Sequence, residues 1–386
     1  MSGCFAGQKD IIEFDIDRQL DFSKTKVINA LEHLQLKDGF PRSVKKGDFE
    51  WSSTGLGGWT SGFFPGLLWY LYEYSGDEQL LVAAKDYSQM LEPVKELEWN
   101  THDLGFMMYN SVGKGFHITG NEHYKDWLLQ TADSLAALYN PNVGTILSWP
   151  WMKHRRGWPH NTIIDNMLNL ELLFWASRVG DNKALYDIAV NHARTTLKNH
   201  FRDDFSSYHV LVYDSASPQV LQKITDQGFA DESVWSRGQA WALYGYVMCY
   251  RETGLPEFRD AAIGISDYYI THLPNDYVPY WDFKLPSFDG EEKDASAAAI
   301  AASGLLELSV LLEEPSLKKK YYTAAVKTLN SLSSDKYISH SSMAILEHGV
   351  GSKPHDSEVG VPLIYSDYYY VEALMRLREM KKSGEF

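Results

Sequence analysis

Apolar residues recur along this chain at intervals of three and four positions, in pairs of segments separated by a short turn. Five such pairs follow one another, and their turns lie at residues 74–77, 120–121, 180–181, 254–256 and 314–316. Each turn contains Gly, Pro, Asp or Asn, which are the residues that commonly end one helix or begin the next. The pattern therefore predicts a series of helical hairpins.

The two members of each pair differ in the placement of their polar residues. The first members, such as 59–74, 235–250 and 295–312, are apolar or small nearly all round. A helix without a polar face has to be enclosed by other helices. The second members carry Lys, Asp and Glu between their apolar positions, so each should expose one face to water. These second members are residues 80–91, 124–138, 185–197, 258–270 and 321–332.

An inner ring of apolar helices wrapped by an outer amphipathic ring is an α/α barrel. Residues 365–378 supply a sixth inner helix, and residues 25–36 supply its outer partner. We therefore expect an all-α fold, an (α/α)6 barrel of six helical hairpins. Residues 1–386 are expected to form a single domain, with residues 1–20 as an irregular N-terminal extension.

Three long segments interrupt the helical pattern and are rich in Pro, Trp, Tyr and Asp. They are residues 149–160, 205–227 and 273–292. Loops of this length in a compact domain are usually functional. No long stretch shows the alternation of polar and apolar positions that is typical of a β-strand.

Composition narrows the classes of ligand. The 386 residues are 44% hydrophobic, as in an ordinary globular protein, and carry a formal charge of −15. This charge argues against nucleic acid as a partner, and an anionic substrate would have to be captured by a local cluster of cations. The 12 Trp and 24 Tyr fit either core packing or stacking on sugar rings.

The two cysteines, Cys4 and Cys249, form no disulfide framework or zinc spacing, and no apolar run approaches membrane-spanning length. Residues 1–4 resemble the end of a bacterial lipoprotein signal, but the apolar stretch that should precede Cys4 is absent. As written, the chain is expected to be cytoplasmic. It would be periplasmic or lipid-anchored if Cys4 is the remnant of such a signal.

Two aspartates, Asp103 and Asp165, each stand at the head of an apolar, helix-like segment. A carboxylate is costly to bury unless it is paired, hydrogen-bonded or used in chemistry. Two of them at the heads of apolar helices are what acid–base chemistry on a sugar-like ring needs. The alternative is that both are helix N-caps, since Asp is a preferred residue at that position.

Residues that begin the inner helices of an α/α barrel converge on one mouth. Arg237 lies in an apolar run between two indoles, and an unpaired buried Arg is costly, so we interpret it as a clamp for a carboxylate. Core packing is the alternative for the tryptophans. His209 and Gln227, on the loop before that helix, are either site residues or satisfied loop residues. The predicted pocket contains Trp59, His102, Asp103, Asp165, Trp235, Arg237 and Trp241.

Several strings together resemble the unsaturated glucuronyl hydrolases of glycoside hydrolase family 88. They are residues 101–106, 165–169, 235–241, 296–301 and 366–374. The resemblance implies a six-hairpin α/α barrel that acts on oligosaccharides released by polysaccharide lyases, of the glycosaminoglycan type. It also implies hydration of the C4–C5 vinyl ether of a terminal unsaturated uronic acid, after which the ring opens and the sugar is released. No metal or organic cofactor is implied.

The resemblance also implies residue roles. Asp165 matches the general acid/base, and Asp103 matches the second essential carboxylate, which keeps Asp165 suitably protonated. One of two tryptophans, Trp149 or Trp151, matches a further stacking residue, and we take Trp151. The remaining matches to substrate contacts are Trp59, His102, His209, Gln227, Trp235, Arg237 and Trp241.

Three alternatives stay open at this point. The first is an unsaturated rhamnogalacturonyl hydrolase acting on pectin fragments, with the same fold and chemistry. The second is a sugar epimerase with paired histidines, and the third is a sugar-binding module without activity. The identity of the glycan and the oligomeric state are also open, and the loop 351–357 is a candidate for contacting the neighbouring sugar or its sulfate.

Overall fold

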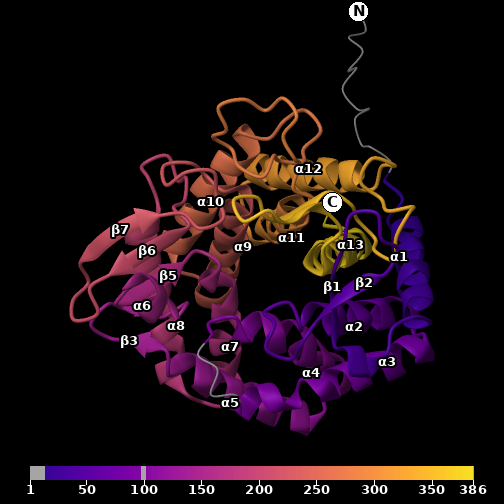
Figure 1. The fold of residues 1–386 in the computed structure, drawn as a ribbon, viewed down its shortest axis with the longest axis horizontal. Helices are drawn as coiled ribbons and strands as arrows, with labels where there is room; N and C mark the ends of the chain where they lie inside the picture. Colours follow the sequence, from indigo (N-terminus) through magenta and orange to yellow (C-terminus); the bar gives the residue numbers. More distant parts are fainter. Residues whose placement is uncertain (1–13, 97–100, 386) are drawn as a thin grey trace, which may run out of the picture.

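The computed structural model describes residues 14–96 and 101–385, and its helices form two concentric rings (Figure 1). The inner ring consists of α2 (Phe63–Ser75), η3 (Gly105–Gly113) continued by α4 (Lys114–Thr119), α7 (Asn166–Val179), α9 (Ser236–Thr253), α11 (Ala295–Leu311) and α13 (Ile364–Ser383). The outer ring consists of α1 (Ile16–Leu31), α3 (Glu78–Met90), α5 (Glu122–Ala136), α8 (Lys183–His200), α10 (Pro256–Thr271) and α12 (Pro315–Leu332).

The inner ring is closed. Each inner helix packs against the next around the ring, and α13 returns to contact α2. Each also packs against one outer helix, which for α13 is α1, at the opposite end of the chain. The predicted (α/α)6 barrel of six helical hairpins is thereby confirmed.

Burial separates the two rings as the sequence pattern predicted. Residues 236–249 of α9 and 295–309 of α11 are all buried, so these inner helices have no wet face. The outer helix α12 buries one stripe at helical spacing, which consists of Tyr321, Ala324, Ala325, Thr328, Leu329 and Leu332. The apolar interior of the barrel therefore lies between the rings and within the inner ring.

The turns within the hairpins follow the expected chemistry. Gly76 ends α2 with φ of +67°, a left-handed conformation in which glycine carries no steric cost. Asp77 then caps α3, because its side chain accepts a hydrogen bond from the backbone N–H of Gln79. Gly120 and Asn121 repeat this arrangement between α4 and α5. These local signals explain why the helical hairpins could be predicted from the sequence.

Short antiparallel strands, which the sequence did not predict, occupy the connections between hairpins. They are β1 (Phe40–Val44), β2 (Trp51–Thr54), β3 (Tyr139–Asn140), β4 (Thr145–Ile146), β5 (His160–Ile163), β6 (Val210–Tyr213), β7 (Val220–Ile224), β8 (Gly349–Ser352) and β9 (Ser357–Val361). Consecutive strands pair as β1–β2, β3–β4 and β8–β9, and β5, β6 and β7 form a three-stranded sheet in that order. The remaining short helical segments are η1 (Leu36–Asp38), η2 (Glu92–Glu96) and α6 (Met152–Arg156).

The N-terminal region differs from the prediction. Helix α1 begins at Ile16, so the expectation that residues 1–20 are irregular is wrong for residues 16–20, and the helix expected over 25–36 starts nine residues earlier. Cys4 lies outside the described residues, so its interpretation as the remnant of a lipoprotein signal stays a prediction. The expectation of a single domain over 1–386 stays a prediction. Within the described ranges, no helix has the length and apolar character that crossing a bilayer requires.

Candidate active site

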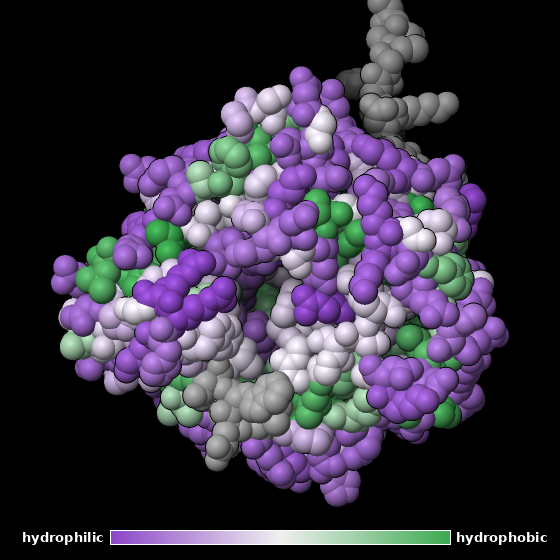
Figure 2. Space-filling view, in the orientation of Figure 1, coloured by the Kyte–Doolittle hydropathy of each residue, from purple (hydrophilic) through white to green (hydrophobic). Residues whose placement is uncertain are grey.

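One end of the barrel gathers the N-terminal ends of the inner helices together with the β-hairpins. β1 and β2 precede α2, β5 precedes α7, and β8 and β9 precede α13. We call this end the hairpin mouth. Figure 2 shows the face with a hollow near its centre, bordered by hydrophilic residues above it and by residues of intermediate hydropathy to its lower right. The residues that begin the inner helices therefore converge here, as expected.

Neither predicted catalytic aspartate uses its side chain as a helix cap. Asp165 stands directly before α7, but no backbone N–H of the helix donates to its carboxylate. Asp103 Oδ2 instead accepts a hydrogen bond of 2.9 Å from Thr101 Oγ1. By contrast, the carboxylate of Asp294 accepts from two backbone N–H groups at the start of α11. The N-cap interpretation is therefore wrong for Asp103 and Asp165.

A close approach of two inner helices brings the two aspartates to the same pocket. A Cβ atom at Gly105, near the start of η3, would lie 2.6 Å from the Cα of Asn169 on α7. Only glycine permits this contact. The side chain of Asn169 also accepts a hydrogen bond of 2.9 Å from the backbone N–H of Phe106. The heads of η3 and α7, which carry Asp103 and Asp165, are thus fixed against each other.

The two carboxyl groups differ in their surroundings. Burial raises the pKa of Asp165 to about 7; the positive charge of Arg237 opposes this rise, and the negative charge of Asp103 adds to it. Asp165 Oδ2 is buried and has no hydrogen-bond partner among the described residues. Asp103 is held by Thr101 and lies next to His102. Two nearby acids with unequal surroundings are the arrangement expected of an acid–base pair.

His209 presents an N–H group to Asp165. Its Nδ1 accepts hydrogen bonds from the backbone N–H groups of Asp226 and Gln227, at 3.1 and 3.3 Å. Burial, followed by the charge of Arg237, holds the pKa of His209 well below its usual value, so the ring is neutral. With Nδ1 acting as an acceptor, the ring hydrogen is on Nε2, which lies 3.8 Å from Asp165 Oδ2. The predicted His209 is therefore directed at the acid.

His102 is directed at the other acid. Its Nδ1 lies 2.9 Å from the backbone oxygen of Ser148, which can only accept, so Nδ1 carries a hydrogen. Its Nε2 lies 3.2 Å from Asp103 Oδ1. The imidazole of His102 therefore faces the Asp103 carboxylate through Nε2. Sequence reasoning placed His102 in the pocket and did not foresee this pairing.

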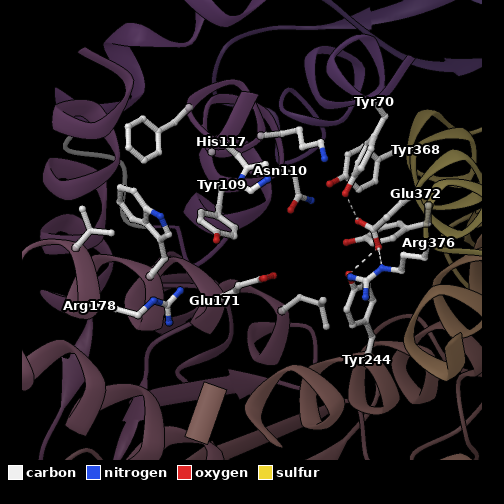
Figure 3. Close-up of a pocket in the computed structure, with 17 residues that line it drawn as sticks. Tyr70, Tyr109, Asn110, His117, Glu171, Arg178, Tyr244, Tyr368, Glu372 and Arg376 are labelled. Carbon is white, nitrogen blue, oxygen red and sulfur yellow. Dashed lines mark hydrogen bonds and ion pairs between the residues drawn. The ribbon is translucent and has the colours of Figure 1, made fainter. Parts of the chain in front are cut away.

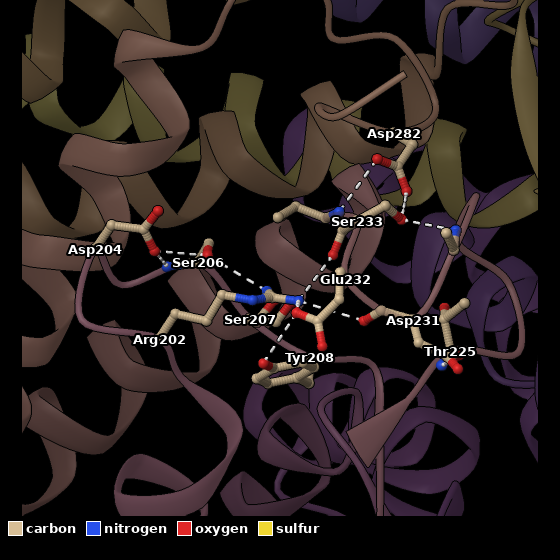
Figure 4. A network of polar contacts seen from close by, with 12 residues as sticks. Arg202, Asp204, Ser206, Ser207, Tyr208, Thr225, Asp231, Glu232, Ser233 and Asp282 are labelled. Carbon is tan, nitrogen blue, oxygen red and sulfur yellow. Dashed lines mark hydrogen bonds and ion pairs between the residues drawn. The ribbon is translucent and has the colours of Figure 1, made fainter. Parts of the chain in front are cut away.

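A polar network fixes the loop that carries His209 into the pocket (Figure 4). Arg202 donates through Nη1 to the backbone oxygen of Ser207 and through Nη2 to that of Ser233, at 3.2 and 3.3 Å. Asp282 accepts a hydrogen bond of 2.5 Å from Ser233 Oγ. Arg202 thereby ties the two ends of the long loop between α8 and α9 to each other, and Ser233 ties its second end to Asp282.

Aromatic rings form the walls of the pocket. The ring centroids of Trp235 and His209 lie 4.5 Å apart, and those of Trp59 and Tyr365 lie 4.9 Å apart. Trp241 is fully buried, and its indole N–H has no hydrogen-bond partner among the described residues. Its proximity to Asp165 lowers the pKa of that carboxyl. Three of the four predicted tryptophans, Trp59, Trp235 and Trp241, thus belong to the aromatic lining at this end of the barrel.

Arg237 is already engaged by the protein. Its Nη1 lies 3.3 Å from Asp294 Oδ2 and also donates to the backbone oxygen of Val350. Its Nη2 donates to the backbone oxygen of Gly351 at 2.6 Å, and its Nε has no partner among the described residues. The premise that Arg237 is an unpaired buried cation is wrong, because Asp294 balances its charge. The side chain thereby links the β8–β9 hairpin to α9. A substrate contact would have to use Nε, the one guanidinium nitrogen without a partner among the described residues.

The two remaining predicted substrate contacts, Gln227 and Trp151, lie in different parts of the site. Gln227 donates through Nε2 to the backbone oxygen of Gly351 at 3.2 Å, so it also fastens the β8–β9 hairpin. The Trp149 ring lies 5.9 Å from that of His209, whereas Trp151 is 47% exposed and lies 6.4 Å beyond Trp149. Of these two tryptophans, the geometry favours Trp149 as the one that lines the pocket and places Trp151 at its rim.

Two residues that lie beside the predicted site were not predicted from the sequence. Tyr365 packs against Trp59, and its ring centroid lies 5.4 Å from the guanidinium of Arg237. Asp294 stands at the head of α11 and pairs with Arg237. A signal for Asp294 was present, since a buried Arg near the start of α9 requires an acid on a neighbouring inner helix. No comparable signal distinguished Tyr365 from the other tyrosines of the chain.

Comparisons with known proteins agree with this architecture. A family model for Glycosyl Hydrolase Family 88 matches residues 27–382. An unsaturated glucuronyl hydrolase of Formosa agariphila is 41% identical over 349 residues, which cover 89% of this chain and 86% of that protein. An unsaturated chondroitin disaccharide hydrolase of Streptococcus pyogenes serotype M1 is 32% identical, covering 96% and 93% respectively. The crystal structure of an unsaturated glucuronyl hydrolase specific for heparin superposes with a TM-score of 0.90 at 41% identity, covering 95% of this chain and 98% of that one.

Proposed function

The chain belongs to Glycosyl Hydrolase Family 88, and we propose that Asp165 and Asp103 carry out its chemistry. It is an unsaturated glucuronyl hydrolase, and therefore a glycosidase. Its substrates are oligosaccharides that end in a 4,5-unsaturated uronic acid, which it removes by hydration of the vinyl ether. The roles of individual residues in the following steps are our proposal.

In the first step, protonated Asp165 delivers its proton to C4 of the unsaturated ring. The C4–C5 double bond is consumed, and positive charge develops at C5 and the ring oxygen. A water molecule then attacks C5, and the Asp165 carboxylate accepts a proton from it, which restores the acid. The hemiketal formed at C5 opens, and the neighbouring sugar is released. One water molecule is added, and Asp165 ends the cycle in its starting form.

The observation that carries this proposal is the state of Asp165. Its pKa is raised to about 7, so the carboxyl keeps a proton near neutral pH and can still accept one back. Its Oδ2 is buried without a hydrogen-bond partner among the described residues, at the end of the barrel where the pocket opens. A carboxyl left unpaired in an apolar site is costly, and catalysis supplies the reason for it.

Asp103 acts on the charge balance of the pocket. Its negative charge contributes to the raised pKa of Asp165, and it can bind ring hydroxyl groups of the substrate. His209 directs its Nε2–H towards Asp165, where it can stabilise the carboxylate formed after proton delivery. Trp235, beside His209, and Trp59, beside Tyr365, offer apolar surfaces for the faces of sugar rings.

A panel of unsaturated disaccharides from heparin, chondroitin, hyaluronan and rhamnogalacturonan tests the substrate. We expect loss of the double-bond absorbance for the glucuronyl substrates and none for the rhamnogalacturonan product. Heparin-derived substrates rank first, because the relative described as specific for heparin is 41% identical and the chondroitin hydrolase is 32% identical. Turnover of the pectin fragment alone would overturn the substrate class and leave the fold assignment standing.

Reaction in deuterium oxide tests the order of bond changes. Delivery of the proton by Asp165 from one side should place a single deuteron on one face of C4. If the anomeric bond broke first, the released unsaturated sugar would lose its double bond later, in solution. Its C4 would then take a deuteron on one face in some molecules and on the opposite face in others. Proton NMR of the products distinguishes the two outcomes.

A further inference from the structure

A second cavity lies at the other end of the same barrel, away from the acid pair (Figure 3). Its volume is about 370 Å³, which falls in the range of about 300–1,000 Å³ that is typical of small-molecule sites. Its walls come from α2, η3, α4, α7, α9 and α13. None of the predicted pocket residues lines it. We call it the far cavity.

The far cavity is accessible to solvent along one edge. The last residues of α7 lie at its rim, where the side chain of Arg178 is 58% exposed and Val179 is 36% exposed. Deeper in, Leu168 is buried and Tyr369 is almost fully enclosed. The cavity is thus a pocket with one open side, in which a ligand could be largely surrounded by protein.

The charged groups around the far cavity already compensate one another. Lys114 Nζ lies 2.8 Å from Glu73 Oε2, and Arg376 Nη1 lies 2.7 Å from Glu307 Oε2. Arg178 is paired with Glu252 in the same way. An anionic ligand would find each of these cations engaged, and a cationic ligand would be placed beside several guanidinium groups. The electrostatics therefore favour a neutral ligand.

Several polar groups that face the far cavity retain unused hydrogen-bonding capacity. Asn110 Nδ2 is buried and has no acceptor among the described residues. Glu171 is bound by Arg251 through Oε1, which leaves Oε2 as an acceptor. Figure 3 shows the Glu171 carboxylate and the Asn110 amide directed into the space beside Tyr109. A donor, an acceptor and a phenol together match hydroxyl groups, each of which both donates and accepts.

Aromatic rings supply the apolar part of the cavity. The Trp175 ring lies 6.1 Å from that of Tyr109 and 5.7 Å from that of Phe116, and all three line the cavity. Aromatic surface next to hydroxyl-matching polar groups is the combination that suits a sugar, whose ring has C–H faces and a hydroxyl edge. The polar and apolar parts of the far cavity thus point to one class of ligand.

We propose that the far cavity is a second binding site, for a neutral mono- or disaccharide. Tyr109, Asn110 and Glu171 bind its hydroxyl groups, and Trp175 contacts its ring. This site is distinct from the pocket of Asp165 and does not depend on the roles proposed for that pocket.

Calorimetric titration of the full chain with glucose, N-acetylglucosamine and maltose tests the proposal. The far-cavity variants are Tyr109→Phe, which removes one hydroxyl, and Glu171→Gln, after which Arg251 still contacts Glu252 and Glu307. Tyr365→Phe is the matched control, because it removes the same hydroxyl from a buried tyrosine at the hairpin mouth. Melting temperatures show that each variant is folded.

We expect saturable binding of at least one of these sugars, unchanged in Tyr365→Phe and weakened about tenfold or more in the far-cavity variants. The far-cavity variants should keep the kcat/KM of the wild type. Absence of binding for all three sugars would overturn the proposal. So would binding that is lost in Tyr365→Phe and kept in Tyr109→Phe, since the sugar would then occupy the catalytic pocket. If Glu171→Gln fails to fold, Tyr109→Phe decides the question.

Discussion

The two ends of this barrel are built from the same inner helices, yet they differ in how their carboxyl groups are satisfied. At the hairpin mouth, Asp165 Oδ2, His209 Nε2 and Trp241 Nε1 are buried without hydrogen-bond partners among the described residues. At the far end, Arg251 contacts the carboxylates of Glu171, Glu252 and Glu307. The hairpin mouth keeps a carboxyl oxygen of Asp165 unpaired, whereas the far end pairs its carboxylates with guanidinium groups.

This contrast distinguishes residues that serve the reaction from residues that stabilise the fold. A buried polar atom without a partner costs free energy, so its persistence indicates use by a ligand or a reaction. A buried ion pair with several partners resists the removal of any member, because the others become uncompensated. Helix α7 contributes to both ends, since Asp165 precedes its first residue and Glu171 faces the far cavity. The contrast predicts which substitutions should affect activity and which should affect stability.

The largest effect is expected at Asp165. Asp165→Asn removes the acid but keeps its shape, and we expect kcat to fall by about 10²–10⁴-fold with substrate binding nearly intact. The assay is decay of the substrate's double-bond absorbance, with binding measured separately by calorimetry. Asp77→Asn is the matched control at the head of the outer helix α3, where asparagine can still cap the helix. Wild-type turnover in Asp165→Asn would remove this residue from the mechanism.

The same variant carries a stability test with a defined sign. Between the ordinary pKa of 3.8 and the raised value of about 7, folded Asp165 holds a proton that the unfolded chain has released. Wild-type stability from this group is therefore present at low pH and lost as the pH rises through about 7. Asparagine does not titrate, so the variant does not lose stability in this way. The melting temperature of Asp165→Asn minus that of the wild type should therefore increase as the pH rises from 4 to 8.

At the far end, the expected effect is on stability. Arg251→Met leaves three carboxylates without their shared partner, although Arg376 still contacts Glu307 and Arg178 still contacts Glu252. Because Arg251 is about one quarter exposed, we expect a loss of about 2–3 kcal/mol, at or below the usual range for a broken buried pair. Urea unfolding measures this loss, and kcat/KM should stay at the wild-type value. A selective loss of activity in Arg251→Met would contradict the division between the two ends.

The sequence predicted the helical framework because its signals are local. Glycines and capping residues such as Gly76 and Asp77 mark each turn, and apolar periodicity separates inner helices from outer ones. Asp103 and Asp165 could be proposed for the same reason, since both begin apolar helices and the barrel brings such positions together. These inferences need only the chain near each residue and the rule that inner helices share a mouth.

What the sequence could not provide were pairings between distant segments. The first residues of the strands β5 and β6 are 50 positions apart, and nothing in either strand identifies its partner. The partner of Arg237 is Asp294, on another inner helix, and the carbonyl groups that it binds belong to β8 and its hairpin. Without those contacts, a buried Arg looked available for a substrate. The error concerned the partner of Arg237, and its contact with the substrate stays a prediction.

Arg237 is a test of this comparison between the two ends of the barrel. It lies at the hairpin mouth, but its charge is paired with a carboxylate, as is the charge of Arg251 at the far end. Arg237→Lys keeps the charge beside Asp294 and loses the paired contacts with Val350 and Gly351. We expect a stability loss of about 1–2 kcal/mol together with a raised KM, since the β8–β9 hairpin is released. Thermal unfolding and steady-state kinetics on one preparation measure both. A raised KM with an unchanged melting temperature would support the original interpretation as a substrate clamp.

The smallest expected effect is a shift in pH dependence at Trp241. The general acid has to be protonated, so kcat/KM should fall as the pH rises above about 7. Trp241 lowers the pKa of Asp165, so Trp241→Phe should move this decline to higher pH, by about half to one pH unit for a contact of about 1 kcal/mol. Trp69→Phe is the matched control, because Trp69 is equally buried and its indole N–H donates to Ser88, away from the site. An equal shift in both variants, or a decline that moves to lower pH in Trp241→Phe, would show that the indole does not act on Asp165.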